Sequence, residues 1–164
     1  FGEYFKYEKS PEYWLTDVSG IPFGMMSEML QDGGNPYRGM LYGMTAREPM
    51  ESVPSQLWKV WDAFGIKDSR MMGYWVSYNP VKTGRNDVLA TSFVKDGKVM
   101  IAIASWAKKD SDIKLQIDWE KLGIDADKAR LTAPDIKGFQ EGFSLSPKDK
   151  IKLPKDKGFI FILE

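Results

Sequence analysis

Two residue types that this sequence lacks narrow the chemistry open to it. Its 164 residues include no His and no Cys. Histidine-based catalytic triads, zinc sites built from Cys and His, thiol nucleophiles and disulfides are therefore excluded within this sequence. Acid–base or nucleophilic chemistry has to come from carboxylates, with Lys, Arg, Tyr, Ser and Thr as the remaining reactive or polar groups.

Two glutamates stand where catalytic carboxylates are expected. Glu28 follows the apolar segment 21–27, which we interpret as a strand, and Glu3 lies in segment 1–5, interpreted as the end of the preceding strand. In a barrel of alternating strands and helices, the C-terminal ends of the strands form the active face. We therefore predict that Glu28 and Glu3 are the catalytic pair. The alternative is a structural Glu28, bonded to a loop or a helix N-terminus, and a solvent-exposed Glu3 near a chain end.

A loop bent by two glycines carries three candidate substrate-binding residues: Asp32, Asn35 and Arg38. Polar side chains on such a loop can bind the hydroxyl groups of a ligand, and an Arg can hold an anionic group. The competing explanation, which we favour for this loop, is a turn in which Asp and Asn cap the backbone. No Gly-Lys-Ser/Thr follows the glycines, so the loop is not a phosphate-binding loop.

Aromatic residues add two candidates for substrate binding, Tyr37 and Trp14, chosen for their position near the predicted loop and strand ends. Aromatic rings can stack on a ligand, but they more often pack in a core. Core packing is expected for most of the others, because they stand beside aliphatic residues at helix or strand spacing. These are Tyr42, Trp58, Trp61, Trp75, Trp106 and Trp119.

Charge and apolar content exclude several partners. The 23 basic residues equal the 23 acidic ones, so no basic excess points to nucleic acid. The longest apolar run, 100–104, is far too short to span a membrane. Asp110 and Asp112 resemble a loose calcium-ligand pair, but no Gly-centred loop or later Glu completes the set. We predict no metal, no cofactor, no nucleic acid and no membrane partner.

Residues 1–68 are predicted to be alternating helices and strands. A helix begins at Ser10, an apolar strand covers 21–26, a second apolar run covers 40–44, and a helix from residue 54 ends at Gly65. This order favours units of a parallel α/β sheet or barrel. About 65 residues cannot close an eight-fold barrel, which typically needs about 250.

Residues 69–164 are predicted to be an antiparallel β-sandwich, because many short apolar segments are separated by regular turn signals. Asp96-Gly97 predicts a tight hairpin, and Asp118 predicts the start of a short helix that ends at Gly123. The fold class expected for the whole chain is α+β, with a partial α/β barrel-like segment before the sandwich. The predicted strands are 73–78, 88–94, 99–106, 113–117, 129–132, 143–145, 151–153 and 159–163.

Several strings resemble one known group of proteins: a bacterial family long catalogued as a domain of unknown function and grouped with the glycoside hydrolases. They include SGIPFGMMSEML at 19–30 and GGNPYRGM at 33–40, and they continue at 42–45, 58–65, 72–75, 80–83, 90–92, 104–106 and 117–119. The resemblance implies a (β/α) barrel with a C-terminal β-sandwich, a carbohydrate substrate and a periplasmic or secreted location.

Taken together, these observations predict the C-terminal portion of a glycoside hydrolase that uses carboxylate acid–base chemistry on glycans. The piece itself is expected to be inactive, with residues 1–65 covered by the remainder of the barrel or by self-association. One alternative is a non-catalytic carbohydrate-binding or structural β-sandwich module. Another is a protein–protein interaction domain, in which the Met- and Tyr-rich first part is a docking surface.

Overall fold

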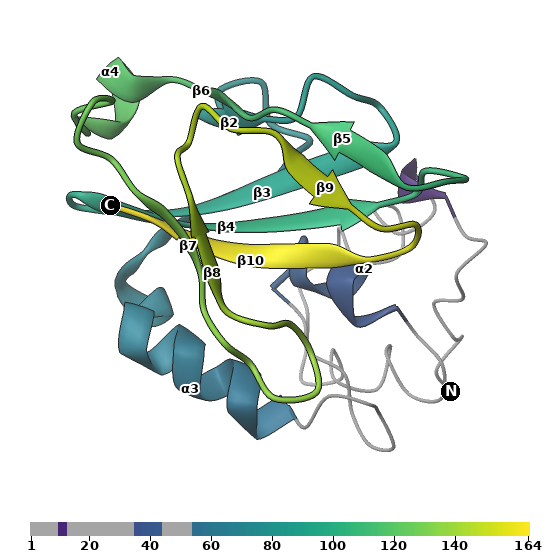
Figure 1. Ribbon diagram of the computed structural model, residues 1–164. Coiled ribbons are helices and arrows are strands. Elements are labelled where there is room, and N and C mark those ends of the chain that lie inside the picture. Colours follow the sequence, from purple (N-terminus) through teal and green to yellow (C-terminus); the bar gives the residue numbers. More distant parts are fainter. Residues whose placement is uncertain (1–9, 13–34, 44–53) are drawn as a thin grey trace.

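A six-stranded antiparallel sheet forms the centre of the computed structural model, which describes residues 10–12, 35–43 and 54–164 (Figure 1). Two smaller sheets of two strands each accompany it, β2 (Val81–Lys82) with β6 (Gln116–Ile117) and β5 (Ser111–Ile113) with β9 (Ile151–Leu153). The strands of the central sheet, in spatial order, are β1 (Arg70–Met72), β3 (Val88–Lys95), β4 (Lys98–Ser105), β10 (Gly158–Leu163), β7 (Leu131–Ala133) and β8 (Phe143–Leu145).

Both faces of the central sheet are buried. Along β4, Ile101 and Ile103 point to the face covered by the two small sheets, and Met100 and Ala102 point to the opposite face. On that opposite face lie α2 (Pro36–Met40) and α3 (Pro54–Phe64), below the sheet in Figure 1. Because side chains of a strand alternate between faces, a strand buried on both sides needs an unbroken apolar sequence, and residues 99–104 supply one.

The predicted α+β class with an antiparallel β-sandwich is confirmed. The β3–β4 hairpin turns at Asp96-Gly97 as expected, and Gly97 has a φ of 75°, which favours glycine. The short helix α4 (Trp119–Leu122) begins at Asp118, whose side chain accepts a hydrogen bond from the Lys121 amide, 3.0 Å away. In the described ranges, no helix has both the length and the apolar character needed to cross a bilayer.

Three predicted strands were wrong in part. Residues 73–78 form successive turns after β1. The backbone turns so that the Trp75 ring lies against Gly73, and it does not continue the sheet. Within 40–44, the residues up to 43 end a helix and form a turn. The segment 113–117 contains the last residue of β5 and both residues of β6, and these two strands pair with different partners.

The boundary predicted between residues 68 and 69 stays a prediction, but α3 packs as part of the sandwich. Its Leu57 and Phe64 are 5% and 4% exposed and join the core cluster that contains Phe93 and Met100 of the central sheet. The 3₁₀ turn η2 (Ile66–Asp68) then leads directly into β1. This packing favours a boundary before α3, near residue 53.

Two truncated chains, 53–164 and 69–164, separate these boundaries. The longer chain is expected to be more stable by about 3–6 kcal/mol as an upper range, because two large apolar side chains stay buried. Urea titrations followed by circular dichroism measure the difference. Equal unfolding free energies would show that α3 does not stabilise the sandwich, and would support the boundary at residue 68.

Candidate functional site

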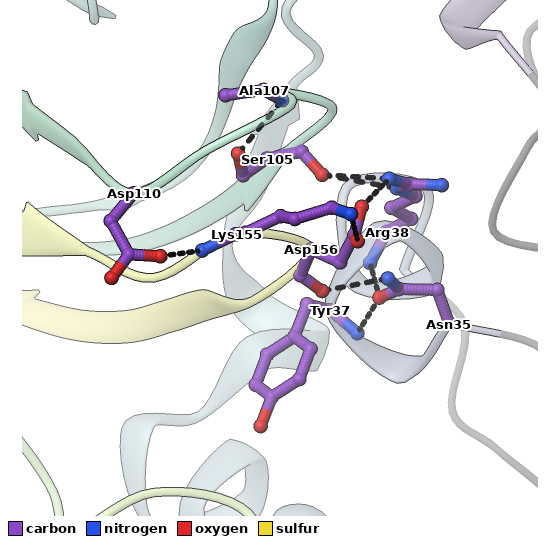
Figure 2. Close-up of polar contacts among 8 residues, drawn as sticks. All are labelled: Asn35, Tyr37, Arg38, Ser105, Ala107, Asp110, Lys155 and Asp156. Carbon is purple, nitrogen blue, oxygen red and sulfur yellow. Dashed lines mark hydrogen bonds and ion pairs between the residues drawn. The ribbon is translucent and has the colours of Figure 1, made fainter.

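The predicted site residues divide into two groups. Glu28, Glu3, Asp32 and Trp14 lie outside the described residues, so their roles stay predictions. The structure describes the other three candidates, Asn35, Tyr37 and Arg38, and brings them together at one end of α2, against the central sheet (Figure 2). The described candidate site is therefore the contact between this short helix and the sandwich.

Asn35 is the N-cap of α2. Its side-chain oxygen accepts hydrogen bonds from the amides of Tyr37 and Arg38, at 3.0 and 3.1 Å. Pro36 occupies the first helical position, where a missing N–H costs nothing. The Asn35 amide group is turned outward from the helix and donates to the Asp156 carbonyl oxygen, 2.8 Å away. One fully buried residue therefore starts the helix and also ties it to the β9–β10 turn.

Arg38 is only 1% exposed and its charge is matched inside the protein. Its Nε and Nη2 both donate to the Ser105 carbonyl oxygen, at 3.1 and 2.9 Å, and Nη2 also donates to Asp156 Oδ1, 2.8 Å away. The guanidinium carbon lies 4.5 Å from the centre of the Trp106 ring. A planar, weakly hydrated guanidinium suits this combination of carbonyl, carboxylate and aromatic contacts better than a Lys would.

Asp156 holds an unusual backbone conformation at the β9–β10 turn. Its φ of 56° is the one positive value among the described non-glycine residues. Asp tolerates this region better than most residues do. Here the conformation presents both the backbone carbonyl and the carboxylate to Asn35 and Arg38. The neighbouring Lys155 amide donates to Asp110 Oδ1, 2.8 Å away, which holds the other side of the same turn (Figure 2).

Sequence reasoning missed Ser105 and Asp156. The dipeptide Asn35-Pro36 is a recognisable helix start, and Asp156 follows Pro154 in a turn sequence, so local signals for both ends were present. Nothing in the sequence says that two segments 118 residues apart meet. The pairing depends on where the sheet places the β9–β10 turn.

Tyr37 lies in the wall of a cavity of about 610 Å³. Its hydroxyl donates to the Phe139 carbonyl oxygen, 3.0 Å away, and the two rings are 4.7 Å apart. The Lys157 ammonium lies 5.3 Å from the centre of the Tyr37 ring. The volume is in the range of small-ligand pockets. Because Tyr37 is only 8% exposed, it offers an edge to this cavity and not a free ring face.

A second cluster joins α2 to the loop after β1. The hydroxyls of Tyr42 and Tyr74 are 2.9 Å apart, and the Tyr74 hydroxyl donates to the Pro11 carbonyl oxygen, 3.1 Å away. Burial raises the pKa of both phenols above their ordinary value of 10.0, and for Tyr42 the hydrogen bond to Tyr74 raises the pKa further. These hydroxyls therefore stay neutral and serve as structural hydrogen-bond partners.

Metal chemistry gains no support from the described part of the chain. Within residues 10–12, 35–43 and 54–164, no group of three or more Asp or Glu side chains is arranged to hold a metal ion. The described arrangement can hold a helix and line a cavity. The proposed acid–base carboxylates belong to the segment outside it.

Removing the Asp156 carboxylate should destabilise the protein. Asp156→Ala is expected to lower the unfolding free energy by about 2–4 kcal/mol, because a buried guanidinium loses a charged partner. Asp156→Asn keeps an acceptor and should lose less. Chemical denaturation measures each change.

Two controls accompany this measurement. Asp156→Gly separates the backbone from the side chain, because glycine adopts the same φ without strain. Asp112→Ala removes an exposed carboxylate on β5 and should change stability by less than about 0.5 kcal/mol. An Asp156→Ala effect as small as this would show that the ion pair does not hold α2.

The paired phenols should make stability fall at high pH. Below about pH 10 they are neutral in both folded and unfolded chains. Above it the unfolded chain releases protons that the folded chain retains, so the unfolding free energy decreases as pH rises. Urea titrations from pH 8 to 11 should show this decrease, and it should be shallower in the double variant Tyr42→Phe/Tyr74→Phe. Identical slopes would contradict the raised pKa values.

Comparison with known protein families gives two adjoining matches. Residues 53–164 match the model described as the C-terminal domain of glycoside hydrolase 123, and residues 1–49 match the model described as its TIM-barrel domain. None of the curated proteins compared with the chain matches it. The first match covers more than half of the sequence and contains every strand described above.

Proposed function

The chain belongs to the glycoside hydrolase 123 family, and on that basis we propose that it serves as the C-terminal portion of an enzyme that hydrolyses glycosidic bonds in glycans. The observation that carries this proposal is the pair of adjoining matches, in the order barrel and then C-terminal domain. A carbohydrate is accordingly the proposed substrate. The described sandwich supports the proposal through its architecture.

The proposed chemistry uses a pair of carboxyl groups. Most glycosidases place two Asp or Glu side chains on opposite sides of the scissile bond, one as acid and the other as base or nucleophile. With no His or Cys in the sequence, Glu28 and Glu3 are our candidates for this pair. Both fall within residues 1–49, which match the barrel domain. The proposal does not assign which of the two roles Glu28 takes.

We further propose that residues 1–164 alone do not turn over substrate. The barrel match covers 49 residues, whereas a closed eight-stranded barrel typically needs about 250. The active-site cleft of such a barrel is built from all eight strand ends, so further barrel units are required for activity. The sandwich already buries the apolar side chains of α2 and α3. Those units, or a second copy of the chain, are the proposed cover for the other apolar residues of segment 1–65.

A non-catalytic carbohydrate-binding module remains the alternative. It predicts glycan binding without hydrolysis, even when the complete barrel is present. Two exposed aromatic side chains on the sandwich, Trp75 and Tyr78, favour a binding surface of some kind. Turnover by the barrel-containing enzyme distinguishes the two functions.

The mechanistic proposal is tested with Glu28→Gln in a chain that contains the complete barrel. Turnover of a panel of 4-nitrophenyl glycosides is expected to fall by about 100-fold or more, with a nearly unchanged melting temperature, because acid–base groups typically contribute 10²–10⁴-fold. Glu120→Gln, on the exposed side of α4, is the matched control and should retain turnover. Full turnover with lost stability in Glu28→Gln would identify a structural carboxylate instead.

A further inference from the structure

The loop between β1 and β2 exposes two large aromatic side chains. Trp75 is 42% exposed and Tyr78 is 49% exposed. Trp75 was expected to pack in the core, and that expectation is wrong. A contiguous exposed apolar patch marks a binding site more often than a single exposed side chain does.

Trp75 is nevertheless held in one orientation. Its ring stacks on that of Tyr42, with centres 5.7 Å apart and planes inclined by 11°, and it meets Tyr74 edge-on at 5.0 Å. Gly73 lies so close that a Cβ there would come within 2.4 Å of the Trp75 ring atoms. The ring is thus fixed before any ligand arrives, which lowers the entropy lost on binding.

The loop backbone that carries this ring is equally ordered. The Tyr74 amide donates to Thr91 Oγ1, 3.3 Å away, and Thr91 Oγ1 in turn donates to the Leu41 carbonyl oxygen, 2.8 Å away. At the other end, the buried Asn79 side chain donates to the Ala90 carbonyl oxygen, 2.9 Å away. Both ends of the loop are therefore bonded to the edge of β3.

A cavity of about 380 Å³ lies beside the same loop and shares Tyr74 and Asn79 with it. Its lining includes Leu89 of β3 and the buried side chains of Val81 and Ala90. Three exposed side chains in the lining can donate or accept hydrogen bonds: Lys82, Asn86 and Gln116. The Arg85 guanidinium, also in the lining, is paired with the Asp87 carboxylate through two hydrogen bonds of 2.8 Å.

We propose that Trp75 and this cavity form a glycan-binding subsite on the sandwich, separate from the proposed catalytic pair. A sugar ring has an apolar face of C–H groups, which an exposed indole can cover, and a rim of hydroxyls, which amide and ammonium side chains can bind. Asp87 neutralises Arg85, and the exposed Lys82 ammonium can donate hydrogen bonds to the hydroxyls of a neutral sugar, the ligand to which the proposal commits. The choice of a glycan as ligand rests on the proposed function.

Binding is tested with the chain of residues 1–164 on a printed array of neutral oligosaccharides, followed by isothermal titration with the best ligand. Trp75→Ala is expected to raise the Kd about tenfold or more, as truncation of a central Trp does at other interfaces. Trp58→Ala is the matched control, because Trp58 is 49% exposed but lies on α3. It should leave the Kd unchanged.

Two further variants test the geometry. Gln116→Ala removes a group from the cavity and should weaken binding several-fold, and Gly73→Ala keeps Trp75 but displaces its ring, so it should weaken binding too. Circular dichroism and melting temperatures establish that each variant is folded. Absence of binding to every neutral glycan, or equal weakening by Trp58→Ala and Trp75→Ala, overturns the subsite.

The outcome is distinguishable from that of the proposed function. Binding that depends on Trp75, together with absent hydrolysis by the barrel-containing enzyme, would refute the enzyme and retain the subsite. Hydrolysis with no Trp75-dependent binding would support the enzyme and refute the subsite.

Discussion

A buried positive charge determines how α2 meets the sandwich. Arg38 is almost completely removed from water, and a guanidinium in that position needs a carboxylate and further acceptors around it. Asp156 and the Ser105 carbonyl supply them. Displacing α2 from the sheet would leave this charge in an apolar layer without its acceptors. The contact therefore fixes the position of the helix on the sheet. The left-handed conformation of Asp156 is maintained by the same contact.

The central sheet explains why such a contact is available. Because both of its faces are covered, by small sheets on one side and by α2 and α3 on the other, β4 and β10 carry apolar side chains in both directions (Figure 1). The Arg38 contact uses the end of β4 and the turn before β10, and the Trp75 loop begins where β1 ends beside β3.

Burial changes how the candidate residues are interpreted. Asn35 and Arg38 have the polar groups expected of a ligand-binding loop, yet those groups bond to the protein itself. Trp75 shows the opposite case: its spacing in the sequence predicted a core residue, but its side chain is exposed in the structure. Residue type alone therefore separates ligand contacts from structural contacts poorly in this chain, because both uses need the same donors, acceptors and rings.

Local signals in the sequence were sufficient for much of the sandwich. The apolar runs of β3 and β4, the Asp96-Gly97 turn and the Asp118 cap each act within a few residues, so propensity and hydrogen bonding nearby decide them. The strand expected at 73–78 does not form, because Trp75 stacks on Tyr42, a tertiary contact that overrides strand propensity. Only the tertiary structure pairs Arg38 with Asp156 and stacks Trp75 on Tyr42. Such contacts join segments far apart in the chain, and their energy depends on burial that the packed sheet alone creates.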